Sequence, residues 1–326
     1  MKTKMNKLET FSKIKDEILK ANSIAITAHV NPDGDNLGSV LAMYSMLKTL
    51  GKAPEILIDD EIPSTFKFLP NIGEIKRPEN FDKVYDLIIV LDSGDVGRIG
   101  RTKMLFEKAV MTVNLDHHMT NPEFAKLNYV GKRSATGEVL FEFFESCNLK
   151  LNCEIATCLF TAISSDTGSF KYDSTTDYTF HAASKLMAEG IDINEIAVNL
   201  FQNRSKSRTE LLISAAENAN YYFNDRVCIG RVTNKMISDL SCAKHDSEGI
   251  VEFLRDTDTV KVAVLLKERA EGGVRVSLRS KYSFDCSKVA LAFNGGGHMK
   301  AAGCTVEGSI EDVEKAVLSE IKKQMR

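Results

Sequence analysis

The chain has 326 residues, a length that suits two domains of ordinary size. Hydrophobic residues make up 43% and charged residues 27% of it, the composition of a soluble globular protein with a sizeable core. A net charge of -3 excludes a basic protein that wraps nucleic acid without specificity. The first 20 residues are charged and lack the apolar centre of a signal peptide, and no apolar run reaches the ~20 residues of a membrane span. We therefore expect a cytoplasmic protein without a membrane segment.

Short apolar runs rich in β-branched residues recur through the first half of the chain. They predict strands at residues 24–30, 54–60, 87–93 and 111–117. A helical pattern between the first two, at 37–51, ends at a glycine that suits a helix C-terminus. Continuous apolar strands alternating with helices are typical of a parallel sheet covered on both faces. The sequence thus predicts an α/β fold whose N-terminal domain has a mostly parallel sheet flanked by helices.

Helical patterns dominate from residue 134 to about 222, and the segment 205–223 predicts a helix that crosses between two halves. Alternating patterns then return at 225–233, 260–268 and 273–280. They are followed by an expected short helix at 294–304 and a last amphipathic helix from Ser309. We expect three parts: an N-terminal domain at 1–195, a helical linker at 196–223 and a smaller α/β domain at 224–326.

Carboxylates and imidazoles gather where four apolar runs of the first half end. Because ligands bind at the carboxyl ends of parallel strands, side chains in these places are candidates for a shared site. Each also has an ordinary structural explanation, as a turn former, a helix cap or a buried histidine. Four such coincidences in one sheet favour a site. The candidates are His29, Asp33, Asp35, Asp92, Asp116, His117, His118 and Asp166.

This set is rich in oxygen donors and contains no thiolate, which disfavours a structural zinc site and suits Mn²⁺ or Mg²⁺, with Co²⁺ as a third option. Asp33 and Asp35 flank a glycine and can point toward two different ions, and Asp92 on the central strand is placed to bridge them. Two divalent ions ~3.5–4 Å apart form the usual clamp for in-line attack on a phosphate. The pattern predicts a two-metal phosphoesterase.

Five ordered motifs give the chain a resemblance to the DHH/DHHA1 phosphoesterases, and among them to the short bacterial nano-RNase/pAp phosphatases (NrnA-like). In order they are AHVNPDGDNLGS (28–39), VLDSGD (90–95), LDHH (115–118), SSDTGSF (164–170) and GGGHMKAAG (295–303). A lone DHH tripeptide carries little information, whereas five motifs in order cover nearly the whole chain. The resemblance implies a DHH domain, a DHHA1 domain and an active site in the cleft between them.

Particular roles also follow from the resemblance. It implies that His29 and Asp33 hold one metal, that Asp35, His117 and Asp166 hold the second, and that Asp92 bridges the two. It further implies that His118 faces the scissile phosphate, where it stabilises charge or protonates the leaving oxygen, and that Asp116 orients an imidazole.

The second domain offers a candidate phosphate clamp. Gly295, Gly296 and Gly297 free the backbone to approach an anion, His298 adds an imidazole, and Arg279 at a strand end can bind a phosphate with two hydrogen bonds. The alternatives, a flexible glycine loop and a surface cation, stay open for each feature alone. The resemblance implies that this domain contacts substrate phosphates.

The favoured interpretation is a hydrolase that releases mononucleotides from oligoribonucleotides of a few residues and removes the 3′-phosphate of pAp. A neighbouring alternative is a hydrolase of linear or cyclic dinucleotides, such as pApA or c-di-AMP. A nucleotide-binding regulator with a decayed site is the non-enzyme alternative, which the intact set of acids and histidines opposes. Short RNA and pAp are the expected partners, long nucleic acid and membranes are not, and a homodimer through the first domain is an open option.

Overall fold

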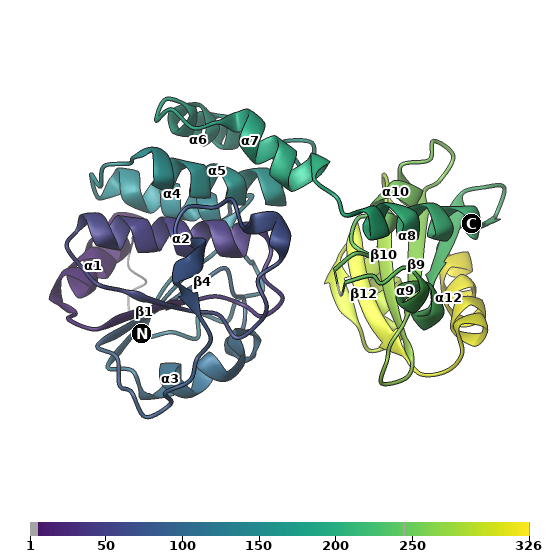
Figure 1. Cartoon of the computed structure of the whole chain (residues 1–326), viewed down its shortest axis with the longest axis horizontal. Helices are drawn as coiled ribbons and strands as arrows, with labels where there is room; N and C mark the ends of the chain where they lie inside the picture. Colours follow the sequence, from purple (N-terminus) through teal and green to yellow (C-terminus); the bar gives the residue numbers. More distant parts are fainter. Residues whose placement is uncertain (1–5, 244, 326) are drawn as a thin grey trace. The chain divides into compact units, whose positions relative to one another are not determined.

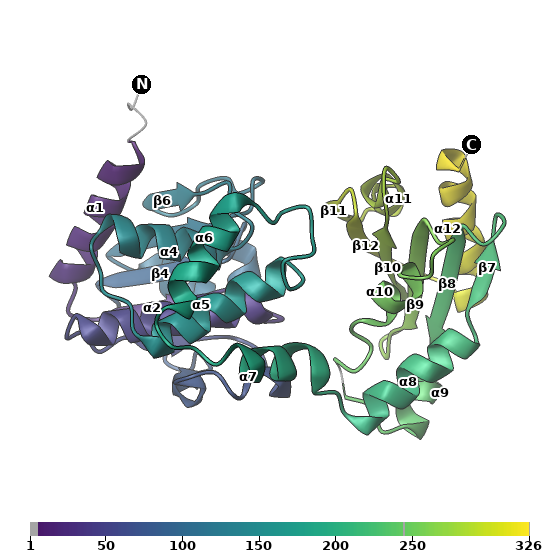
Figure 2. The ribbon, with the colours of Figure 1, turned by 90° about the horizontal axis from the view of Figure 1, so that it is seen from above.

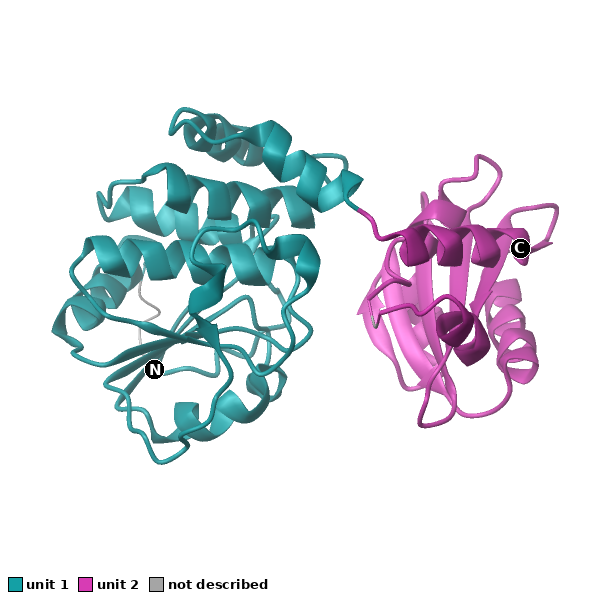
Figure 3. Cartoon of the chain, in the orientation of Figure 1, with its two compact units in different colours: residues 1–203 teal, residues 204–326 magenta. Residues whose placement is uncertain are grey.

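The structure is a computed structural model that describes residues 6–243 and 245–325. The chain divides into two compact units, residues 1–203 and 204–326, which are coloured separately in Figure 3. The predicted linker, 196–223, contributes its first residues to unit 1, whereas its later residues form a helix and a strand of unit 2. No helix of the described residues is long and apolar enough to span a membrane.

Unit 1 is built on a six-stranded sheet in which all strands are parallel, in the order β3-β2-β1-β4-β5-β6. Its strands are β1 (Ile24–Thr27), β2 (Glu55–Leu57), β3 (Ile75–Lys76), β4 (Leu87–Leu91), β5 (Met111–Asp116) and β6 (Leu127–Val130). Its α-helices are α1 (Lys7–Lys20), α2 (Gly34–Thr49), α3 (Lys103–Lys108), α4 (Thr136–Ser146), α5 (Cys153–Asp166), α6 (Asp177–Met187) and α7 (Ile193–Ala197). Short 3₁₀ turns at 64–66, 72–74 and 96–102 and a π-helical turn at 198–202 complete the unit.

Helices cover both faces of this sheet, as Figure 1 shows. Helices α1, α2 and α4 pack on one face and α3 on the other, which explains why every residue of β1 and β4 is buried. Helix α2 is buried on nearly all sides because α5 packs across it. A Cβ atom at Gly38 would lie 2.4 Å from the carbonyl oxygen of Cys158, so only glycine permits this close approach. The predicted flanked parallel sheet is confirmed.

The strand order changes direction between β1 and β4. From β1 the chain builds outward through β2 and β3, and it then returns to place β4 on the other side of β1. The carboxyl ends of the two strands at such a switch point leave a crevice in which open α/β sheets bind ligands. The segments that carry His29 and Asp92 leave the sheet at this point.

Unit 2 is built on a second six-stranded sheet, in the order β11-β12-β10-β9-β8-β7, in which only β8 and β9 pair in parallel. Its strands are β7 (Asn220–Tyr222), β8 (Val227–Val232), β9 (Val262–Glu268), β10 (Val274–Ser280), β11 (Gly296–His298) and β12 (Ala301–Val306). Its helices are α8 (Lys206–Glu217), α9 (Asn234–Asp239), α10 (Ile250–Arg255), α11 (Cys286–Leu291) and α12 (Ile310–Gln324). Figure 2 shows these helices around the sheet.

Two details differ from the sequence expectation. The expected short helix at 294–304 is wrong, because this stretch forms the antiparallel pair β11 and β12. The helix expected at 205–223 ends at Glu217, and a strand follows it. In the stretch 294–304 the glycines destabilise a helix and allow two strands to approach closely. Which of the two structures forms depends on the strand that is available for pairing.

Candidate metal centre

The first candidate ligands follow β1 and begin helix α2. The side chain of Asp33 caps the helix by accepting a hydrogen bond from the backbone N–H of Asn36, 3.0 Å away. Asn36 in turn donates to the carbonyl oxygen of His29, at 2.9 Å, which ties the helix start to the strand end. His29 Nδ1 lies 2.8 Å from the carbonyl oxygen of Val30, so Nε2 is left to face Asp33, 3.7 Å away. This motif therefore presents one imidazole and one carboxylate to the same point.

Asp92 stands between two groups of candidate ligands. One carboxylate oxygen, Oδ2, lies 3.2 Å from His29 Nε2, and the other, Oδ1, lies 3.5 Å from His117 Nε2. Asp92 directly follows β4 and has a φ of 50°, a backbone conformation that is uncommon for residues other than glycine. Its side chain is almost fully buried. The geometry gives each oxygen of one carboxylate to a different group, as a bridge between two ions requires.

The second group joins three distant segments. His117 Nε2 lies 3.8 Å from Asp35 Oδ2 and 3.6 Å from Asp166 Oδ2. Asp166 is the last residue of α5, so it does not cap the start of a helix. His117 Nδ1 faces the carbonyl oxygen of Arg133 at 3.4 Å, which leaves Nε2 for the carboxylates. Atoms of His29, Asp33 and Asp92, and separately of Asp35, His117 and Asp166, lie close enough to share one ion each.

His117 and His118 serve different partners although they are adjacent. His118 Nδ1 donates to Asp116 Oδ1 at 2.8 Å, and the other oxygen of Asp116 accepts from Asn121 at 2.6 Å. The hydrogen bond to Asp116 raises the pKa of His118 from its ordinary value. His118 is also near enough to Asp92 and His117 to join a third group of donor atoms. The pair Asp116 and His118 therefore presents an oriented, readily protonated imidazole beside the first two groups.

The start of helix α4 supports both groups, although it lies outside the five sequence motifs. Backbone N–H groups of Thr136 and Gly137 donate to the two oxygens of Asp35, at 2.6 and 2.9 Å. The hydroxyl of Thr136 donates to Asp92 Oδ1 at 3.0 Å. Thr136 is completely buried. The only signal in the sequence is a Thr-Gly pair at a predicted helix start, which is too common to suggest a site.

The charges of the cluster indicate a need for cations. Burial and the neighbouring carboxylates raise the pKa of Asp35 well above its ordinary value, and the pKa of Asp166 is raised in the same way. Asp92 behaves in the opposite way, because His29 and the two adjacent histidines lower its pKa despite burial. Several buried carboxylates in one place repel one another unless positive charge is added. Oxygen-rich donors of this kind fit divalent cations, so the acidic and histidine groups are positioned for metal binding.

Unit 2 brings the other predicted residues onto one face of its sheet. His298 pairs with Ala301, and Ala301 pairs with Arg279, so the three residues form one row across β11, β12 and β10. The guanidinium of Arg279 donates through Nε to Glu252 Oε1, 2.8 Å away. His298 is exposed. The row therefore holds an open imidazole and an arginine that is already oriented by an acid.

The three glycines have a structural task in addition to any role in binding. A Cβ atom at Gly297 would lie 2.5 Å from the carbonyl oxygen of Ala301, and the residue has a φ of 136°. A Cβ at Gly295 would lie 2.3 Å from the carbonyl oxygen of Gly303. Gly296 has open space around it. Two of the three glycines are thus required for β11 to approach β12.

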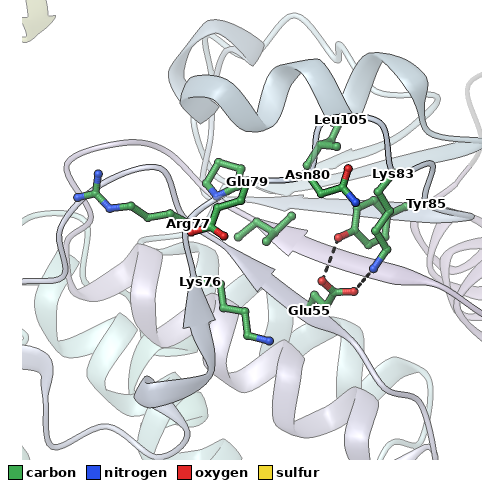
Figure 4. Close-up of a pocket in the computed structure, with 10 residues that line it drawn as sticks. Glu55, Lys76, Arg77, Glu79, Asn80, Lys83, Tyr85 and Leu105 are labelled. Atoms are coloured by element: carbon green, nitrogen blue, oxygen red, sulfur yellow. Dashed lines mark hydrogen bonds and ion pairs between the residues drawn. The ribbon is translucent and has the colours of Figure 1, made fainter.

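A separate hollow of unit 1, about 250 Å³ in volume, lies beside β2 and β3 and is shown in Figure 4. Lys83 and the hydroxyl of Tyr85 both bond to Glu55 at its wall. Lys76 and Arg77 reach its rim. None of the residues predicted from the motifs lines it, so it is distinct from the metal-ligand cluster.

Comparison with known proteins agrees with this geometry. Residues 23–163 match the DHH family, N-terminal domain, and residues 224–326 match the DHHA1 domain. A bifunctional oligoribonuclease and PAP phosphatase of Thermus thermophilus is 31% identical over 95% of this chain and 93% of its own length. The chain therefore belongs to the DHH/DHHA1 phosphoesterase family.

Two further relatives show the range of the family. The crystal structure of an exopolyphosphatase-related protein from Bacteroides fragilis is 26% identical, covers 99% of this chain and 98% of its own, and superposes with a TM-score of 0.90. A cyclic-di-AMP phosphodiesterase of Bacillus subtilis is 26% identical over 93% of this chain but only 49% of its own length. A protein of known structure thus shares the fold of the whole chain.

Proposed function

We propose that this protein is a divalent-metal-dependent phosphoesterase that releases mononucleotides from oligoribonucleotides of a few residues and dephosphorylates pAp. The observation that carries the proposal is the position of the Asp92 carboxylate. Its two oxygens face two separate groups of imidazole and carboxylate donors. The Thermus thermophilus relative, named for both activities, supports the choice of substrates. The free state of all seven cysteines is consistent with a reaction in the cytoplasm.

Six residues would hold two cations. His29 and Asp33 would bind one, Asp35, His117 and Asp166 the other, and Asp92 both. Mn²⁺ suits this mixture of oxygen and imidazole donors best, and Mg²⁺ or Co²⁺ are alternatives. Bound there, the ions would supply an activated water and neutralise charge on the phosphate.

The chain's own residues perform the remaining tasks. Backbone hydrogen bonds of His29 and His117 hold their Nε2 atoms toward the carboxylates. His118, held by Asp116, would donate a hydrogen bond or a proton to the oxygen on which negative charge develops. Its raised pKa keeps a larger fraction of the imidazole protonated near neutral pH.

The second unit would bind a substrate phosphate. His298 and Arg279 lie in one row on one sheet face, and Gly295, Gly296 and Gly297 leave the adjacent backbone without side chains. A guanidinium and an imidazole are both effective phosphate ligands. The ion pair of Arg279 with Glu252 fixes the direction of the guanidinium without using all of its donors.

A second candidate substrate class is the dinucleotides, pApA and c-di-AMP. The similarity to the cyclic-di-AMP phosphodiesterase over 93% of this chain supports dinucleotides as alternative substrates. A role as a nucleotide-binding regulator is opposed by the complete set of donors, because a decayed site loses ligands first.

One product assay tests the proposal. The purified chain, stripped of metal by chelation and resupplied with Mn²⁺, is offered pAp, RNA of two to five nucleotides, pApA, c-di-AMP and pyrophosphate. We expect AMP from pAp and mononucleotides from short RNA, with activity that requires the added metal. Full activity in excess chelator would refute the metal dependence, and hydrolysis of pyrophosphate alone would refute the substrate class.

A further inference from the structure

Unit 2 also contains a hollow, which borders Gly295 and Gly296 of the candidate phosphate clamp but is lined mainly by residues outside it. It has a volume of about 500 Å³ and lies at the edge of β12 beyond the short strand β11. Its lining combines Arg275, Phe293 and Asn294 with the bare backbone of glycines from both strands. A cation, an aromatic ring, an amide and open backbone groups together are the kinds of contact that single-stranded nucleic acid uses.

The register of the sheet relates this hollow to the predicted phosphate-binding row. Arg275, Ser277 and Arg279 alternate along β10 with residues that are buried in the core, so their side chains share one face of the sheet. His298 belongs to the same row as Arg279. Four residues along a strand correspond to about 14 Å. Arg275 therefore lies on the same face as Arg279 but a strand's length away from it, and the hollow extends along the edge of β12 from Arg275 to Gly296, two residues from His298.

Arg275 stands opposite another cationic residue in the sheet. It pairs directly with Lys267 on β9 and with Thr305 on β12. Like charges on directly opposite strand positions destabilise a sheet. Arg275 is exposed, and its side chain has no hydrogen-bond or ion-pair partner among the described residues. The Arg275 guanidinium is therefore available to bind an anion.

We propose that the hollow at Arg275, Phe293 and Asn294 is a subsite for an additional nucleotide of a single-stranded oligoribonucleotide, and that it favours RNA of three or more residues over pAp. Arg275 binds a phosphate of the RNA strand, and Phe293 provides a surface against which a base stacks. The Asn294 side chain provides a hydrogen-bond donor and an acceptor for that base. This inference rests on the proposed function, since it extends the substrate already assigned to the row of His298.

The test compares substrates of different length on one variant. Arg275→Ala should raise the KM for a tetranucleotide relative to the KM for pAp by about ten- to a hundredfold, the usual loss for a contact with a charged group. Arg275→Lys should recover part of the ratio. Arg269→Ala is the matched control, because it removes the same charge from the same hairpin, where Arg269 pairs with Glu271 outside the hollow.

The outcomes separate this inference from the proposed function. A tetranucleotide KM that does not rise relative to that for pAp in Arg275→Ala, or one that rises equally in Arg269→Ala, would overturn the subsite. If the wild-type chain hydrolyses neither substrate, the proposed function is wrong, and fluorescence anisotropy with labelled tetranucleotide in chelator decides the subsite alone. Weaker binding by Arg275→Ala than by Arg269→Ala would support it, and equal affinities would refute it.

Discussion

Replacement of Thr136 by valine tests whether the start of α4 positions the metal ligands. Valine keeps the shape of the side chain and the backbone N–H that Asp35 accepts, and it removes only the hydroxyl that donates to Asp92 Oδ1 at 3.0 Å. Both side chains are almost fully buried, so water does not replace the lost donor. A hydrogen bond to a charged group contributes ~1.5–3 kcal/mol. Loss of such a partner of a ligand typically weakens metal binding by about ten- to a hundredfold.

Isothermal titration of the metal-free protein with Mn²⁺ measures this change, and thermal unfolding in chelator measures stability separately. Thr136→Ser keeps the hydroxyl and should restore most of the affinity. Thr161→Val is the matched control, because Thr161 is equally buried but donates to the carbonyl oxygen of Thr157 within α5, at 2.8 Å. We expect the control to lose stability without losing metal affinity. Wild-type affinity in Thr136→Val would refute the positioning role.

Three further predictions concern both units. Asp92→Ala should abolish turnover and weaken the binding of both metal ions, whereas Asp166→Ala should empty mainly one site. Anomalous scattering that shows two fully occupied sites in Asp92→Ala would contradict the bridging role of Asp92. Because burial and Asp33 raise the folded-state pKa of Asp166, the metal-free folded protein binds more protons than the unfolded chain above about pH 4, and its stability falls as the pH rises toward that raised pKa. Asp166→Asn should therefore raise the Tm of the metal-free protein at pH 7.5, by about 2–4 °C for each kcal/mol gained, and a Tm that stays unchanged or falls would argue against repulsion in the cluster. His298→Ala should leave metal binding intact but lower kcat/KM for pAp by about ten- to a hundredfold, and an equal loss on bis(p-nitrophenyl) phosphate would place His298 at the metals instead.

The sequence alone was sufficient for the fold class of unit 1 and for the set of candidate ligands. A continuous apolar run such as 87–91 can be recognised as a strand because a strand buried on both faces carries apolar side chains on both. The acids and histidines can be recognised because they lie at or just after the ends of apolar runs, and the parallel topology then brings those at strand ends to one edge of the sheet. Local pattern and a general rule of sheets thus suffice to place His29, Asp92 and His117 near one another.

Other features depend on contacts between segments far apart in the chain, and only the tertiary structure reveals them. The glycine-rich stretch at 294–304 forms a strand pair instead of the expected helix, because Gly297 fits against Ala301 only in that pairing. Thr136 has a role at the site only because its hydroxyl donates a hydrogen bond to Asp92, 44 residues away in the chain. Which oxygen of Asp92 faces which histidine is likewise set by packing. Propensity and periodicity describe neighbours along the chain, whereas these contacts are selected by the burial of distant segments against one another.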